Sequence, residues 1–243
     1  MDGDGELGRP GAGDYQGVTL PPLLAVQETV LAADVSLLEV VTLTGVIPCV
    51  RHGGVGDGEV AAAIFVGGAL GGLSGPAGGL YQRVAERTGG VRLHYRRPGD
   101  LDACISDVVL LADLLIQRGC RRVLTIGHSF GGAVAVGAGI ALGTRCAGVV
   151  TLATQAPGCE RVDELVAPIL VVHGEDDAIL PDLASRLVHD LAGGPKELLL
   201  LPGEGHLLSG AADLLDRRVA EFALAVLGSA DGTEDAATPG AVG

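Results

Sequence analysis

The sequence predicts an α/β fold in which a mainly parallel sheet is covered by helices on both faces. From residue 61 onward, short apolar runs alternate with longer segments whose apolar residues recur at helical spacing. The short runs are apolar throughout, which is typical of strands buried on both sides. In such sheets ligands bind beyond the carboxyl ends of the strands, so functional residues are expected there.

We expect eight strands and six helices. The first two strands, in residues 35–45 and 46–54, should form an antiparallel, hairpin-like pair. Asp100 is a plausible N-cap and Gly119 a stop signal for a long helix between them. The other strands are expected at residues 61–68, 91–95, 122–127, 147–154, 168–174 and 196–202. The other helices are expected at residues 77–88, from 130 onward, and at 162–166, 181–191 and 211–227.

One domain is expected over residues 21–228 of the 243. Residues 1–20 and 229–243 are rich in Gly, Asp, Ala and Pro and lack apolar periodicity, so we expect disordered tails. Between Thr154, near the end of one strand, and Ile169 in the next lie about 15 residues, enough for a short helix only. We therefore expect no cap domain.

Composition excludes several classes of function. The net charge of −14, with Lys196 as the single lysine, argues against binding to nucleic acid or to an anionic membrane. The five cysteines show no C-x-x-C spacing, so reduced, buried thiols are expected rather than disulfides or a metal site. The first residues do not resemble a signal peptide, and no apolar stretch is long enough to span a membrane. A cytoplasmic protein without a cofactor is expected, and its oligomeric state stays open.

The stretch "TIGHSFGG", residues 125–132, has the pattern G-x-S-x-G between a predicted strand and a predicted helix. A nucleophilic serine on such a sharp turn needs Gly127 and Gly131, because side chains there would collide. Ser129 is expected in a strained conformation that costs about 1–3 kcal/mol. A dinucleotide-binding G-x-G-x-x-G turn is the alternative, but Ser129 stands where its second glycine belongs, and no G-K-[ST] follows.

A serine hydroxyl needs a base, and the base needs an acid that orients it. Two later strands end in "HGEDDAILP" and "LPGEGHLL", which supply Asp177 and then His206 in the order that this topology requires. His206 lies in a glycine-flanked loop, where a histidine has no packing role, and is the expected base. Asp176 and Glu175 are alternatives to Asp177 as the acid.

These motifs together resemble the α/β-hydrolase superfamily over roughly residues 35–227, and most closely its compact dienelactone-hydrolase-like serine hydrolases. The family's spacing, four residues on from the histidine of "HG", favours Asp177 as the acid. His128 and His173 are assigned structural roles: His128 should turn away into the sheet, and His173 should hold the loop that carries the acid. Dienelactone hydrolase itself has a cysteine nucleophile where this chain has Ser129, so its substrate is not implied here.

The resemblance also implies an oxyanion hole and a substrate pocket. The amide of Phe130 is the first expected oxyanion donor. The second should follow Gly67-Gly68, with Ala69 favoured over Leu70. The pocket should be open and bordered by apolar side chains, namely Leu70, Leu73, Phe130, Ile179, Leu180 and Leu207. One of Arg96 and Arg97 could bind an anionic substrate group, although a solvated arginine paired with an acid such as Asp100 is the simpler interpretation.

The sequence therefore predicts a serine hydrolase that cleaves a carboxylic ester of a small or medium substrate through an acyl-enzyme on Ser129. Activity should rise with pH as the base loses its proton. Thioester hydrolysis or acyl transfer in a biosynthetic pathway is a second hypothesis, although related thioesterases usually carry a lid. A non-catalytic scaffold is a third, although such proteins typically lose a member of the triad, and none is lost here.

Overall fold

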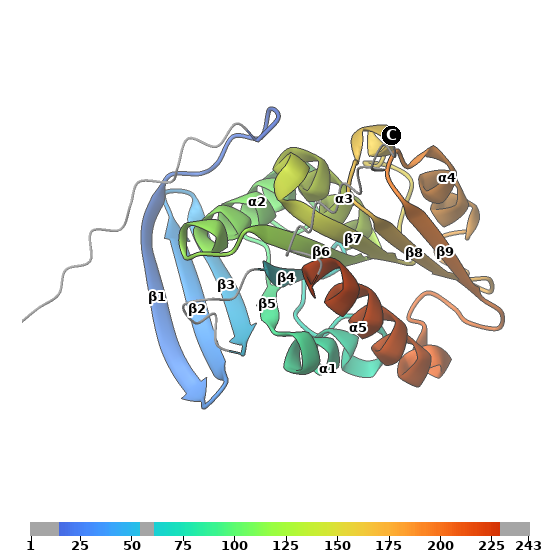
Figure 1. Ribbon diagram of the computed structural model, residues 1–243, viewed down its shortest axis with the longest axis horizontal. Coiled ribbons are helices and arrows are strands. Elements are labelled where there is room, and N and C mark those ends of the chain that lie inside the picture. The colour runs from blue at the N-terminus through green and yellow to red at the C-terminus, as the bar shows by residue number, and fades with distance from the viewer. Residues whose placement is uncertain (1–14, 54–60, 229–243) are drawn as a thin grey trace, which may run out of the picture.

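The computed structural model describes residues 15–53 and 61–228 (Figure 1). Residues 1–14 and 229–243, which belong to the expected tails, lie outside this part. The described residues form one mixed sheet with helices packed on both of its faces. The expected α/β architecture is confirmed.

Within residues 15–53 and 61–228 the sheet has nine strands rather than the predicted eight, in the order β1-β2-β3-β5-β4-β6-β7-β8-β9. The first three strands are antiparallel and β3 pairs antiparallel with β5, while the pairings from β5 to β9 are parallel. The strands are β1 Leu23–Ala32, β2 Val35–Thr42, β3 Gly45–His52, β4 Ala61–Val66, β5 Gly90–Leu93, β6 Arg122–His128, β7 Cys146–Leu152, β8 Ile169–Gly174 and β9 Lys196–Leu201.

The additional strand is β1, at the outer edge of the antiparallel part of the sheet. Most of its residues are exposed, including Leu24, Val30 and Leu31. Because neither face of β1 is consistently buried, its sequence lacks the alternation by which half-buried strands are predicted. The prediction of eight strands was wrong for this physical reason.

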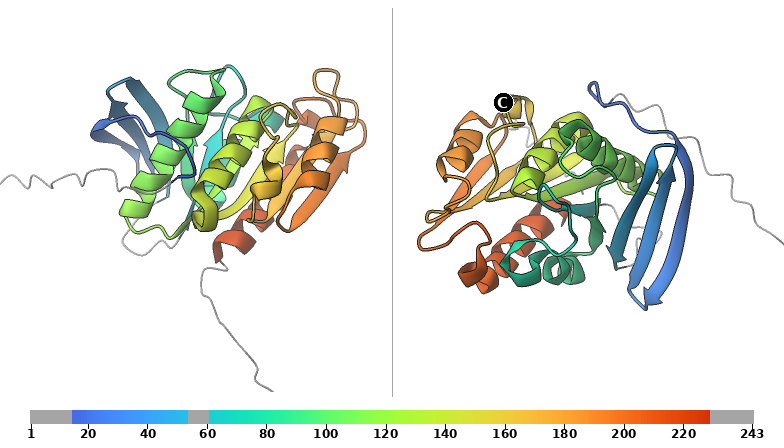
Figure 2. Two further views of the ribbon diagram at one scale, coloured as in Figure 1. Left: turned by 90° about the horizontal axis from the view of Figure 1, so that it is seen from above. Right: turned by 180° about the vertical axis from the view of Figure 1, so that it is seen from behind.

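In the described part of the chain, five α-helices cover the sheet: α1 Pro76–Thr88, α2 Leu101–Gln117, α3 Phe130–Leu142, α4 Leu183–Leu191 and α5 Ala212–Gly228. Figures 1 and 2 show α2, α3 and α4 on one face and α1 and α5 on the other. Each face has its own apolar core, built almost entirely from aliphatic side chains. The expected short helix at residues 162–166 is a 3₁₀ turn, Val162–Glu164, and two further 3₁₀ turns lie at Gly143–Arg145 and Ser209–Ala211.

The segment before β1 packs on the domain, although the sequence predicted a disordered tail up to residue 20. Tyr15 is buried, and its hydroxyl donates a hydrogen bond to Asp113 on α2. The hydroxyl of Ser106, also on α2, donates to the carbonyl of Thr19 at 2.8 Å. Residues 15–20 therefore form a strap across α2, which their own composition does not reveal.

The loops that follow the parallel strands meet at one edge of the sheet. The loop after β4 leads into α1, β6 turns directly into α3 at Ser129, and the loops after β8 and β9 carry Asp177 and His206. Between β7 and β8 the described chain contains only the 3₁₀ turn, so no cap domain is inserted there. Asp100 caps α2 as predicted, because its carboxylate accepts from the Ala103 amide at 3.1 Å.

Candidate active site

Ser129 lies on a sharp turn between β6 and α3. Its backbone has φ 58° and ψ −123°, a left-handed conformation that strains any residue other than glycine. A Cβ on Gly127 would lie 1.8 Å from the carbonyl oxygen of Gly131, and one on Gly131 would lie 2.3 Å from the carbonyl oxygen of Gly67. The predicted strain at Ser129 and the predicted need for both glycines are confirmed.

Three side chains from three loops form a chain of hydrogen bonds. Nε2 of His206 lies 3.0 Å from Oγ of Ser129, and Nδ1 of His206 lies 2.7 Å from Oδ2 of Asp177. The Asp177 carboxylate is fully buried, whereas the His206 side chain is 10% exposed. Because a carboxylate can only accept, Nδ1 of His206 carries the proton, and Nε2 is free to accept from the hydroxyl of Ser129.

The carboxylate of Asp177 is held by its own loop as well as by His206. Oδ1 accepts from the amides of Ile179 and Leu180 at 2.8 and 2.9 Å. Burial alone would raise the pKa of Asp177, but the hydrogen bonds from Leu180, His206 and Ile179 outweigh it, so this pKa lies below its ordinary value. The carboxylate of Asp177 is therefore readily ionised, as its role as acceptor for Nδ1 of His206 requires.

The two alternative acids point elsewhere. Asp176 and Glu175 are both exposed. Glu175 lies 3.6 Å from Arg186 of α4 in a surface ion pair. Asp177 alone of the three contacts His206.

His173 holds the loop that carries Asp177, as the sequence predicted. It is completely buried at the end of β8, and its Nδ1 lies 2.6 Å from the hydroxyl of Ser185 on α4. Its Nε2 lies 3.0 Å from the Leu180 carbonyl and 3.2 Å from Oδ2 of Asp177. An Nε2–H that donates to both acceptors fixes the turn that presents Asp177.

His128 does not turn away from the site, and this corrects the prediction made for it. Its ring lies beside that of His206, with the two centroids 4.8 Å apart, and its Nε2 is 2.9 Å from the backbone carbonyl oxygen of His206. Residues of β6 alternate between the two faces of the sheet, and His128 shares its face with Leu124 and Ile126 of the α1–α5 core. The loop that carries His206 approaches from this same face.

The loop after β4 lies against the nucleophile turn. A Cβ on Gly68 would lie 3.8 Å from Cβ of Ser129. The amide of Gly71 donates to the carbonyl of Gly68 at 2.9 Å, which makes a tight turn with Ala69 and Leu70 at its centre. The structure thus brings the segment predicted to supply the second oxyanion donor next to Ser129.

Five of the six residues predicted to form the open rim of a substrate pocket are exposed or half-buried. Leu70, Ile179 and Leu207 are 91%, 70% and 60% exposed, while Leu73 and Leu180 are half-buried. Phe130 differs from the prediction, because its side chain is buried and packs edge-on against Tyr95 with ring centroids 6.2 Å apart. Its ring belongs to the core, and it does not border the rim.

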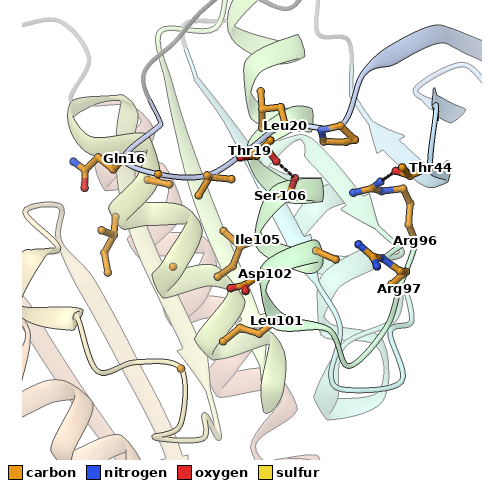
Figure 3. A pocket seen from close by; sticks show the side chains of 18 of the residues that line it. Gln16, Thr19, Leu20, Thr44, Arg96, Arg97, Leu101, Asp102, Ile105 and Ser106 are labelled. Atoms are coloured by element: carbon orange, nitrogen blue, oxygen red, sulfur yellow. Dashed lines mark hydrogen bonds between the residues drawn. The ribbon is translucent and has the colours of Figure 1, made fainter.

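A separate cleft of about 690 Å³ lies along α2 and α3 under the strap (Figure 3). Arg96 and Arg97 line this cleft, and each is paired with an acid. Arg96 is buried in an ion pair with Asp107 and also donates to Thr44, which differs from the predicted solvated loop charge. Arg97 pairs with Asp100 at 3.4 Å, as the simpler interpretation had it. Binding of a substrate anion by either arginine receives no support.

The cysteines and other possible metal ligands are dispersed. All five cysteines are buried, as expected. Within residues 15–53 and 61–228, no group of three or more His, Cys, Asp or Glu side chains is arranged to hold a metal ion. No helix in this part of the chain combines the length and apolarity needed to cross a membrane.

Sequence comparisons with known proteins match only a short part of the chain. No known family model matches the chain. Two uncharacterized proteins from two strains of Mycobacterium tuberculosis are 38% identical over 63 residues, which is 26% of this chain and 21% of theirs. The match thus spans about a fifth of the length of these curated relatives.

Solved structures match far more of the chain, at low sequence identity. Dienelactone hydrolase from Anabaena variabilis superposes with a TM-score of 0.66 at 17% identity, over 81% of this chain and 96% of that one. Est1E from Butyrivibrio proteoclasticus gives 0.63 at 14%, over 84% and 100%. An alpha-beta serine hydrolase homologue from Coxiella burnetii gives 0.63 at 16%, over 79% and 98%. The chain has the α/β-hydrolase fold.

Proposed function

We propose that the protein is a serine hydrolase that cleaves a carboxylic ester through an acyl-enzyme on Ser129. One observation carries the proposal: the hydrogen-bonded series from Ser129 through His206 to the buried Asp177, on a strained turn at the carboxyl edge of the sheet. Strain at a non-glycine residue persists where the surrounding structure enforces it, and it concentrates at functional sites.

In the proposed mechanism, Nε2 of His206 takes the proton of Ser129 as Oγ attacks the ester carbonyl carbon. Asp177 holds the tautomer and stabilises the imidazolium that forms. The amides of Phe130 and Ala69 donate to the oxyanion, and the start of α3 adds the positive end of a helix dipole. His206 returns the proton to the leaving alcohol, and water then releases the acid by the same steps in reverse.

The exposure of the apolar side chains expected at the rim supports a small or medium acyl group of modest polarity. Leu70, Ile179 and Leu207 offer apolar contact without enclosing the substrate. No charged side chain is proposed to select it. Arg96 is buried in an ion pair with Asp107, and the exposed Arg97, which pairs with Asp100, is not part of the proposal.

A panel of p-nitrophenyl esters of increasing acyl length tests the proposal. Wild-type protein should hydrolyse the short and medium members, and Ser129→Ala should lose about a millionfold in kcat. Ser106→Ala is the matched control, because the hydroxyl of Ser106 lies away from the triad and donates to the carbonyl of Thr19 in the strap. Equal hydrolysis by wild type and Ser129→Ala would refute the proposal.

The same panel with sulfur in place of the ester oxygen separates hydrolysis of esters from that of thioesters. We expect the oxygen esters to be turned over at least as well as the thioesters, because no lid is inserted between β7 and β8. A strong preference for thioesters would favour the carrier-linked alternative.

A further inference from the structure

His128 occupies a place next to the proposed base that the mechanism above does not use. It is the last residue of β6 and directly precedes Ser129, and only 8% of it is exposed. On one side its ring lies against the ring of His206, and on the other its Nδ1 would be 4.0 Å from a Cβ on Gly68. One imidazole thus lies between the base and the loop that is proposed to supply the second oxyanion donor.

In the hydrogen bond between His128 and His206, the donor and the acceptor can be assigned. A backbone carbonyl accepts and cannot donate, so Nε2 of His128 must carry the proton in its 2.9 Å contact with the His206 oxygen. Burial lowers the pKa of His128 to about 4, although this hydrogen bond opposes the shift. His128 is therefore neutral near pH 7 and adds no positive charge beside a base that must itself become charged.

The loop that carries His206 needs such an anchor. Glycines at 203 and 205 precede His206, and Gly203 has a φ of +78°. Neighbouring bonds hold the loop on either side: Leu208 N–H donates to the Gly205 carbonyl at 3.0 Å, and Ala77 N–H donates to the Leu207 carbonyl at 2.7 Å. The carbonyl of His206 itself is held by the side chain of His128.

We propose that His128 is a positioning residue, whose Nε2–H holds the backbone of His206 so that Nε2 of His206 stays within hydrogen-bond distance of Ser129. The inference rests on the proposed function. Its physical content is that a donor anchored in a rigid strand fixes a base carried by a glycine-flanked loop. A misplacement of about 1 Å at a reacting group is enough to lower a rate about a hundredfold.

Glutamine and methionine make a matched pair of substitutions, because they have nearly the same length and volume and only glutamine has an N–H donor. His128→Gln should keep kcat within about threefold of wild type, whereas His128→Met should lower it about 10- to 100-fold. KM should change little in both, because His128 does not reach the rim. Rates are expressed per active site titrated with a fluorophosphonate, so that unfolded protein does not count.

His128→Phe supplies a second donor-free variant, which keeps an aromatic ring beside His206. It should behave as His128→Met does, and it replaces that variant if methionine prevents folding. His189→Gln is the control for loss of a histidine. The side chain of His189 on α4 is hydrogen-bonded to the adjacent Asp190, so this variant should leave kcat unchanged. Equal rates per site for the Gln, Met and Phe variants, whether high or low, would overturn the inference, because a merely structural role does not depend on the donor.

Ser129→Ala belongs to the same series and separates the two proposals. If it is inactive while His128→Met equals wild type, only the positioning role fails. If Ser129→Ala remains fully active, the proposed function fails and the positioning role fails with it.

Discussion

At the scale of single residues, Asp177 is distinguished from its acidic neighbours by what its two oxygens accept. Oδ1 receives two backbone amides and Oδ2 receives His206, while His173 supports the loop from the core. Asp176 is exposed, and its contact with the next loop is made through its amide, which donates to the Glu204 carbonyl at 2.9 Å. Two adjacent residues of one type thus have unlike environments, and this difference can be tested.

Asp177→Asn should lower kcat about ten-thousandfold, because an amide at this position favours the wrong tautomer of the base. Asp176→Asn is the matched control and should stay within about twofold of wild type. Ester hydrolysis by the two purified variants measures both. Comparable losses in both, or none in either, would contradict the assignment of the acid.

At the scale of elements, the strand–turn–helix unit of β6 and α3 depends on a backbone that passes within contact distance of itself. The Cα of Gly127 lies against the carbonyl oxygen of Gly131. The Cα of Gly131 lies against the carbonyl oxygen of Gly67, the residue directly after β4. Three glycines, one in β6, one in α3 and one directly after β4, therefore pack without side chains around Ser129. The turn is a property of this packing as well as of the local sequence.

Gly127→Ala should destabilise the protein by about 1–3 kcal/mol or more and abolish hydrolysis, since its Cβ would overlap the Gly131 oxygen. Gly228→Ala at the end of α5 meets no atom within 4 Å and should be neutral or slightly stabilising. Urea unfolding midpoints and ester hydrolysis give the two readouts. The account of the turn would be wrong if both variants matched wild type.

At the scale of the whole molecule, buried histidines make stability depend on pH. The pKa of His128 is about 4 in the folded protein and about 6.5 in an unfolded chain. Between these values the unfolded state binds a proton that the folded state does not, so stability falls as pH falls from about 6.5 towards 4. The buried His52, whose pKa is also lowered by burial, acts in the same direction.

His128→Gln should remove the part of this dependence that belongs to His128. As pH falls from 7 to 4, the unfolding free energy of the wild type should therefore decrease by about 3 kcal/mol more than that of His128→Gln, since one pKa unit is worth about 1.4 kcal/mol. Urea unfolding at a series of pH values measures it. Parallel curves for the two proteins would show that His128 does not titrate as the structure indicates.

Several features of the fold and site follow from the sequence, because they depend on periodicity and on order along the chain. Parallel strands place their carboxyl ends at one edge, so Ser129, Asp177 and His206 come together as the motif order implies. The strained turn at Ser129 follows from its flanking glycines.

Other features depend on contacts between residues that are distant along the chain. Tyr15 is held by Asp113, which lies 98 positions later, and His128 by the carbonyl of His206, 78 positions later. Neither pairing leaves a local pattern, although the alternation of β6 could have shown which face His128 occupies. The edge strand β1 escapes prediction because most of it is exposed, and the few residues that pack on the core, such as Leu23 and Val26, form no regular pattern.

The most direct test of the account is labelling of the wild-type protein with a fluorophosphonate, followed by mass spectrometry of its peptides. The account predicts one adduct, on the peptide that contains Ser129, formed in parallel with the loss of ester hydrolysis and absent from Ser129→Ala. A wild-type protein that stays unlabelled while folded, or that is labelled and inactivated at another residue, would contradict it.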